Sequence, residues 1–137
     1  MISRRTLFMA ASALAALPQA RATEAAMAAA IRAWAGQTPP PGVLTLDMAE
    51  LVENGNAVPV RVAAAEPVVG LALFAPLNPE PEVLQVRFGP AVARPEFSTR
   101  IRLARSQRIV AVAKAADGRC WQAGLDVIVT LAACVEP

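Results

Sequence analysis

From residue 57 onward, apolar and polar side chains alternate with a period of two, and this alternation restricts the fold more than any other feature. Val58, Val60 and Val62 alternate with Pro59 and Arg61, which is the pattern of a strand with one buried and one wet face. The same period returns in segments 71–73, 84–88, 100–103 and 126–131. Turns such as EPVVG, LNPEP and AADGR separate the segments. About seven such strands predict an all-β fold, an antiparallel β-sandwich of immunoglobulin type.

An N-terminal helix is expected ahead of this sandwich. Thr23 is placed to cap a helix that ends at Gly36. Its apolar residues fall on one stripe at helical spacing: Met27, Ile31 and Trp34. The prolines of TPPPG at 38–42 then predict a stiff extended spacer, so we expect the helix to be an appendage of the sandwich at 43–137.

A second, short helix is expected in the segment LDMAELVENG. Asp47 is placed as its N-cap, with Glu50 at the third helical position. Leu46 and Leu51 are spaced as a hydrophobic staple, and the Asn-Gly pair at 54–55 ends the helix.

The composition excludes whole classes of enzyme. A chain of 137 residues that is 55% apolar suits one compact domain. It has no histidine, no tyrosine and a single lysine, Lys114, so enzymes that depend on imidazole are excluded. Glu80 and Glu82 lie in the proline-broken stretch LNPEPEV, and we interpret them as solvated loop charges. We therefore expect a non-catalytic protein with no metal and no cofactor.

The first 22 residues have the three zones of an export signal. A charged start precedes an apolar run from Leu7 to Leu17, and a small-x-small site follows at 20–22. Arg4 and Arg5, just before TLF, predict the twin-arginine form of the signal. The apolar run is far shorter than the ~20 residues that a membrane anchor needs. We expect cleavage after Ala22 and a location in the bacterial periplasm.

Cleavage would change the charge balance of the chain. It removes three of the 13 basic residues and leaves the 11 acidic ones, so the scattered arginines do not predict nucleic-acid binding. The densest basic stretch is 94–108, which holds Arg94, Arg100, Arg102, Arg105 and Arg108. Such a run is usually the wet face of a strand, and it is also able to steer an anionic partner or cargo.

The two cysteines have several interpretations. In an oxidising compartment, Cys120 and Cys134 first suggest a disulfide. Cys120 starts the last predicted strand and Cys134 follows its end, so one extended strand would separate them by about 45 Å, against about 6 Å for a bridge. The disulfide stays open, because Gly124 is able to bulge or break the strand and the tail to fold back.

Without a disulfide, the two thiols have separate roles. Cys120, beside Trp121, is then a small core residue. Cys134, three residues from the C-terminus, is then a thiol that reaches into the cleft of a partner protein. Such a thiol needs exposure and freedom more than a nearby base, because the partner enzyme supplies the chemistry.

Four segments carry a family resemblance: TLDMAELVENGNAVPVRV, NPEPEVLQVRFGP, STRIRLARSQRIVAVAKAADG and the terminal VIVTLAAC. In these segments and in its export signal, the chain resembles SoxY, the sulfur-carrier subunit of thiosulfate oxidation. The resemblance implies an immunoglobulin-like sandwich that forms a heterodimer with a second small subunit, SoxZ, and a sulfur cargo on Cys134. It also implies visits by three periplasmic enzymes. A haem c enzyme couples thiosulfate to the thiol, a hydrolase releases sulfate, and a molybdenum enzyme oxidises the remaining sulfane.

The end of the chain departs from the family pattern. The usual ending is Gly-Gly-Cys-Gly-Gly, whereas residues 132–137 read AACVEP. Alanine and valine carry a Cβ and proline fixes φ, so the segment has less backbone freedom in a narrow cleft. The pattern is similar to that of divergent carriers associated with quinoprotein dehydrogenases, whose cargo is different. The alternative outside transport is a structural or interaction module with a Cys120–Cys134 disulfide.

Overall fold

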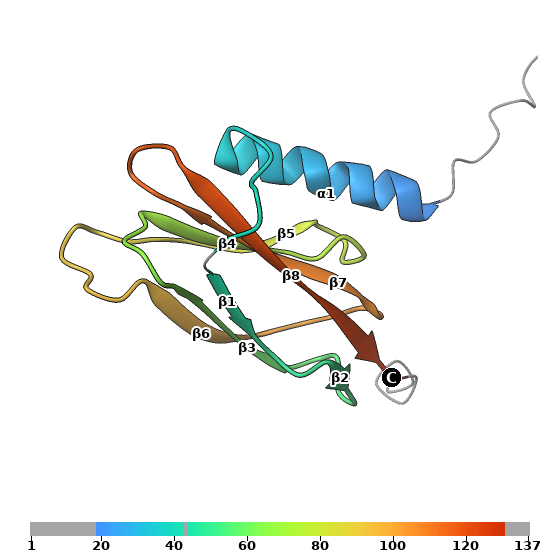
Figure 1. Cartoon of the computed structure of the whole chain (residues 1–137). Helices are drawn as coiled ribbons and strands as arrows, with labels where there is room; N and C mark the ends of the chain where they lie inside the picture. Colours follow the sequence, from blue (N-terminus) through green and yellow to red (C-terminus); the bar gives the residue numbers. More distant parts are fainter. Residues whose placement is uncertain (1–18, 43, 131–137) are drawn as a thin grey trace, which may run out of the picture.

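The computed structural model describes residues 19–42 and 44–130, which form a helix and two packed sheets (Figure 1). One sheet has the strand order β1-β3-β6, with bounds Leu44–Asp47, Val58–Ala64 and Glu96–Ile101. The other has the order β2-β8-β7-β4-β5, with bounds Leu51–Val52, Cys120–Val129, Gln107–Lys114, Gly70–Phe74 and Glu82–Arg87. Among these strands, only β2 and β8 pair in parallel. The predicted all-β sandwich is confirmed.

The helix α1 (Gln19–Ala35) forms a third layer on the outer face of the five-stranded sheet (Figure 1). Strand β4 is therefore buried on both faces. Its Leu71 and Leu73 point into the space between the sheets, whereas Ala72 and Phe74 pack beneath the helix. This double burial explains why the segment GLALF is a continuous apolar run rather than an alternating one.

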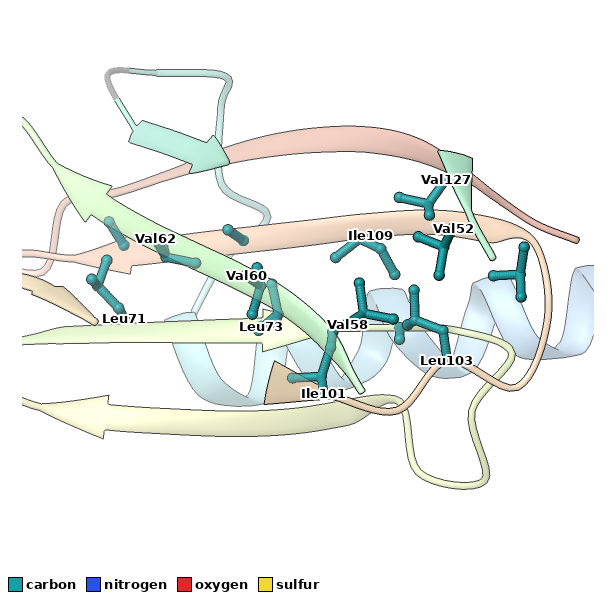
Figure 2. Packing of buried hydrophobic residues seen from close by; sticks show 14 of the residues in the cluster. Val52, Val58, Val60, Val62, Leu71, Leu73, Ile101, Leu103, Ile109 and Val127 are labelled. Carbon is teal, nitrogen blue, oxygen red and sulfur yellow. The ribbon is translucent and has the colours of Figure 1, made fainter. Parts of the chain in front are cut away.

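The main core lies between the two sheets and extends to the end of the sandwich where β8 finishes. Figure 2 shows Val52 and Val127 near Ile109, with Val58 and Leu103 filling the same end. The inward side chains come from every second position of the strands, as the sequence alternation predicts. The fully buried members of this core include Val62, Leu71, Leu73 and Ile109.

The helix predicted in LDMAELVENG is wrong. Residues 44–47 form β1 and pair with β3, so that Leu46 lies opposite Val62 and Asp47 opposite Arg61. Residues 51–52 form β2 and pair with β8. The capping pattern is real, but the alternation of Leu44 and Leu46 with polar neighbours lets the segment bury its apolar side as a strand.

The N-terminal helix is confirmed, but its predicted start is not. The helix begins at Gln19, so Thr23 lies inside it and is not its N-cap. Its C-terminal end is as expected: Gly36 follows with a φ of 82°, and its N–H donates to the carbonyl of Arg32 at 2.8 Å.

The proline spacer after α1 lies along β8 rather than standing free. Gln122 forms three hydrogen bonds with it: its backbone N–H donates to Pro40 O at 2.9 Å, its side-chain Nε2 donates to Pro39 O at 2.6 Å, and its carbonyl accepts from Gly42 N at 3.2 Å. Pro39 is fully buried. The helix is therefore held on the sheet by its own packing and by the linker. No helix within the described ranges is long and apolar enough to cross a membrane.

Candidate functional site

Strand β8 runs from one end of the sandwich to the other without a bulge in its pairing with β7. It pairs with β7 in one register from Lys114 opposite Cys120 to Gln107 opposite Val127. Gly124 takes its regular place in this ladder, so the bulge considered from the sequence is absent from β8. The guanidinium of Arg108 crosses Gly124 and pairs with Asp126 at 3.3 Å, so a Cβ at position 124 would displace this exposed side chain.

Cys120 lies beneath α1, at the end of β8 nearest the β7–β8 turn. Its side chain is only 2% exposed and packs in one cluster with Ile31, Ala35 and Phe74. Gln37, just after the helix, donates a hydrogen bond from Nε2 to its Sγ at 3.3 Å. This burial confirms the interpretation of Cys120 as a small core residue. Reagents in solvent therefore have almost no access to its thiol.

The turn before Cys120 contains Asp117, a carboxyl group with a lowered pKa. Hydrogen bonds from Arg119, first from its backbone N–H and then from its guanidinium, lower the pKa of Asp117 below its usual 3.8. Gly118 takes a φ of 90° in this turn, a conformation that favours glycine. The turn therefore fixes where β8 begins.

The opposite end of β8 is held from both sides. On the β2 side, the backbone N–H groups of Ile128 and Thr130 donate to Glu50 O at 2.7 Å and Val52 O at 2.9 Å. On the β7 side, Ser106 Oγ accepts from Val129 N at 2.8 Å. The same hydroxyl lies 3.3 Å from Val129 O, to which it donates. The chain is thus fixed in place up to Thr130, four residues before Cys134.

A network of amide side chains holds the β6–β7 turn beside this strand end. Gln107, only 8% exposed, accepts from Leu77 N at 2.8 Å and donates from Nε2 to Asn78 Oδ1 at 3.1 Å and to Arg105 O at 3.0 Å. Asn78 Nδ2 in turn donates to Arg102 O at 2.7 Å. Two neighbouring turns are therefore locked together next to the point where β8 ends.

Cys134, the predicted cargo site, lies outside the described residues, so its cargo role and the alternative disulfide with Cys120 both stay predictions. The other singled-out residues are spread over the sandwich. Glu80 is exposed in the β4–β5 turn, but Glu82 is the first residue of β5 rather than a loop residue. Lys114 ends β7 and donates to Trp34 O at 3.3 Å. In the described part of the chain, no group of three or more metal-ligating residues gathers.

The five arginines of the basic stretch do not form one face. Arg94 precedes β6 at the far end of the sandwich, and Arg100 lies on β6 opposite Pro59. Arg108 is paired with Asp126 on the outer face of the five-stranded sheet. Only Arg102 and Arg105 belong to the turn beside the end of β8.

Sequence reasoning missed the residues that fix this end of the strand. Ser106 and Gln107 are neighbours at the start of β7, whereas Asn78 is 29 residues away from Gln107 in the sequence. No local pattern distinguishes them from other polar turn residues. The one available signal was a glutamine at a position where the alternation of β7 demands burial.

Comparison with known proteins bears on this site. The family described as "Sulfur oxidation protein SoxY" matches residues 30–134, most of the chain. The chain belongs to the SoxY family. The family match ends at Cys134, the residue that the sequence singles out.

Solved structures agree with this assignment. The SoxY-family chain is 32% identical to the sulfur carrier protein SoxY from Chlorobium limicola f thiosulfatophilum, with a TM-score of 0.68. The match covers 78% of this chain and 98% of that one. A superoxide reductase (neelaredoxin) from Ignicoccus hospitalis is 20% identical over 65% of this chain and 81% of its own, with a TM-score of 0.58. That likeness concerns the fold alone. No curated protein matches in a sequence search.

Proposed function

We propose that the chain is a non-catalytic sulfur carrier of a sulfur-oxidation system, with the sulfur bound to Cys134. Membership of the SoxY family and the likeness to the Chlorobium carrier protein support this role. The burial of Cys120 supports Cys134 as the working thiol, since one of the two cysteines is already part of the core.

The observation that carries the proposal is the unbroken path of β8. Nine steps along the strand place the Cα atoms of Cys120 and Val129 about 30 Å apart. The five residues from Val129 to Cys134 span at most about 18 Å when fully extended. In our proposal the two cysteine Cα atoms therefore stay about 12 Å or more apart, beyond the ~7 Å limit of a disulfide. This bound supports an unpaired thiol at the end of the chain.

A thiol in this place suits chemistry performed by other proteins. Joining thiosulfate to Cys134 forms one S–S bond, releases the thiol proton and passes two electrons to an oxidising partner, a haem c enzyme in our proposal. Hydrolysis then adds water across the terminal S–S bond, so that sulfate leaves and a persulfide stays on Cys134. The carrier itself needs no general base for these steps, in keeping with a chain that lacks histidine.

The carrier works outside the cytoplasm and with a second subunit in this proposal. The twin-arginine signal at residues 1–22 directs export to the periplasm, where the thiol meets its partners. A SoxZ-like subunit forms the heterodimer, and a hydrolase and a molybdenum enzyme act on the loaded thiol after the haem c enzyme. Membership of the SoxY family supports these partners as a set.

The C-terminal sequence of this chain departs from the family pattern, and this departure bears on the identity of the cargo. Its AACVEP ending is bulkier and stiffer than a glycine-rich one. Sulfur bound through thiosulfate remains the first candidate, and a different cargo handled by a quinoprotein dehydrogenase system is the second.

The test is made in cells that oxidise thiosulfate. We expect peptides with Cys134 to carry added sulfur or sulfonate mass, and Cys134→Ser to abolish both the adducts and thiosulfate-dependent growth. Cys120→Ser is the matched control, because it alters the buried thiol and leaves the adducts in place. Unchanged thiosulfate-dependent growth of the Cys134→Ser strain would refute the proposal, and an adduct of another mass on wild-type Cys134 would identify the second cargo.

A further inference from the structure

The surface around the end of β8 has an acidic side and a basic side. On the β2 side, Glu50 and Glu53 are exposed, and the backbone of Glu50 binds Ile128. On the β7 side, Arg102 and Arg105 are exposed in the β6–β7 turn, whose Ser106 binds Val129. The segment that carries Cys134 therefore begins between an acidic and a basic flank.

From this division we infer that Arg102 and Arg105 form a binding site for an anionic sulfur group attached to Cys134. The inference rests on the proposed function, because it concerns the cargo that this thiol would bear. Its ligand is a sulfur oxyanion, such as the terminal sulfonate left after thiosulfate is joined to the thiol. A reduced sulfane on the same thiol lacks the oxygens that guanidinium groups bind.

The two arginines are held in position by their backbone. Asn78 donates to the carbonyl of Arg102 at 2.7 Å, and Gln107 donates to that of Arg105 at 3.0 Å. The amide network around the buried Gln107 thus fixes the turn while both arginine side chains are exposed to solvent. An anion site built on a fixed turn requires less ordering on binding than one built on a mobile loop.

Both guanidinium groups are available for an anion. Arg61, Arg108 and Arg119 are engaged with Glu96, Asp126 and Asp117. Within the described residues, Arg102 and Arg105 take part in no ion pair of this kind. Guanidinium is also the side-chain group best matched to planar, bidentate contact with an oxyanion.

The distances allow the contact. Arg105 is the neighbour of Ser106, which binds Val129 directly. From Thr130 the chain reaches Cys134 in four residues, a span of at most about 14 Å. The acidic flank repels a sulfonate on that segment, so both flanks favour its approach to the arginines.

The test compares alkylation of Cys134 by iodoacetate, an anion, and iodoacetamide, its uncharged analogue. Both reagents attack the same thiolate and release iodide, so the ratio of their rate constants reports the local potential. We expect Arg102→Gln with Arg105→Gln to lower this ratio by about three- to tenfold at low salt. The difference should shrink in ~1 M salt, where the Debye length is about 3 Å. Peptide mass spectrometry follows Cys134 separately from Cys120.

Two controls make the result decisive. Arg94→Gln removes an exposed arginine at the far end of the sandwich and should leave the ratio unchanged. The carboxylate of Glu136, two residues from Cys134, also affects the local potential. The two arginines are therefore also replaced in a Glu136→Gln background, where the ratio of rate constants should fall as well. An equal ratio with and without the two arginines would overturn this inference alone. A Cys134 that reacts with neither reagent and bears no adduct would instead overturn the proposed function.

Discussion

Ser106 and Val129 exchange two hydrogen bonds through one hydroxyl, which accepts from Val129 N at 2.8 Å and donates to Val129 O at 3.3 Å. This pair joins the β6–β7 turn to the last residue of β8. It replaces the ladder bonds that β7 would supply if it began two residues earlier, with Arg105 opposite Val129, because the hydroxyl meets both backbone groups of Val129.

Loss of this hydroxyl should loosen the end of β8. We expect Ser106→Ala to lower the free energy of unfolding by about 1–2 kcal/mol, because it leaves the N–H of Val129 without its partner. Amide hydrogen exchange at Val129 should accelerate more than exchange at Val112 in mid-strand. Ser98→Ala, on an exposed face of β6, is the control. Unchanged exchange at Val129 would mean that the hydroxyl does not hold the strand.

The amide network should matter more than the single hydroxyl. Gln107→Ala removes the partner of Leu77 N and one of the two donors to Asn78 Oδ1, which keeps its bond from Ala104 N at 3.2 Å. We expect it to cost about 2–3 kcal/mol in urea unfolding, since Leu77 N is left unpaired in a part-buried site and the bonds from Nε2 to Asn78 and Arg105 are lost as well. Gln85→Ala, which loses only an exposed bond from Trp34 Nε1, should cost well under half as much. Equal costs would contradict the role given to Gln107.

Gly55 is required by a close approach of two backbones. A Cβ at this position would lie 2.5 Å from Leu103 O and 3.3 Å from a methyl group of Val129. We therefore expect Gly55→Ala to destabilise the sandwich by about 1–3 kcal/mol, measured by thermal or urea unfolding. Gly89→Ala meets nothing within 4 Å and should be close to neutral. Equal stability of the two variants would show that the turn before β3 yields easily.

The export signal gives a prediction that is independent of the fold. Arg4→Lys with Arg5→Lys should block export, so that the full-length precursor accumulates in the cytoplasm. The exported wild-type protein should begin at Thr23, as read by N-terminal peptide mapping. Arg21→Lys, beside the predicted cleavage site, keeps the twin arginines and should still be exported. Normal export of the Arg4 and Arg5 variant would contradict the twin-arginine assignment.

The strands were predictable where alternation alone decides them. Val58, Val60 and Val62 bury one side of β3 as the pattern indicates. Segment 71–73 is a strand as predicted, but its expected wet face is wrong: β4 is buried on both faces because the helix covers the second one. In these elements the local pattern and the tertiary environment favour the same structure.

The failures occurred where local signals and pairing disagreed. Asp47 and Glu50 have the spacing of a helix start, yet the segment gains more by adding strands to both sheets. Thr23 is a good cap, but the helix continues four residues further toward the N-terminus. The Asn78–Gln107 network joins residues that meet only in the folded chain, so no local pattern could predict it.

The burial of Cys120 was predictable from the sequence, but the face of the sheet on which it lies was not. A cysteine beside a tryptophan at the start of a strand is readily interpreted as a core residue. That it lies on the helix side of the sheet, beneath Ile31 and bound by Gln37, depends on how α1 crosses the strands.

The central claim is that the two thiols are separate, with Cys120 buried and Cys134 available to other proteins. The most direct test is alkylation of the native, non-reduced exported protein, followed by peptide mass spectrometry. We expect Cys134 to be alkylated or to carry a sulfur adduct, and Cys120 to react only after unfolding. A Cys120–Cys134 linked peptide, or a Cys134 that is neither alkylated nor loaded, would contradict the account.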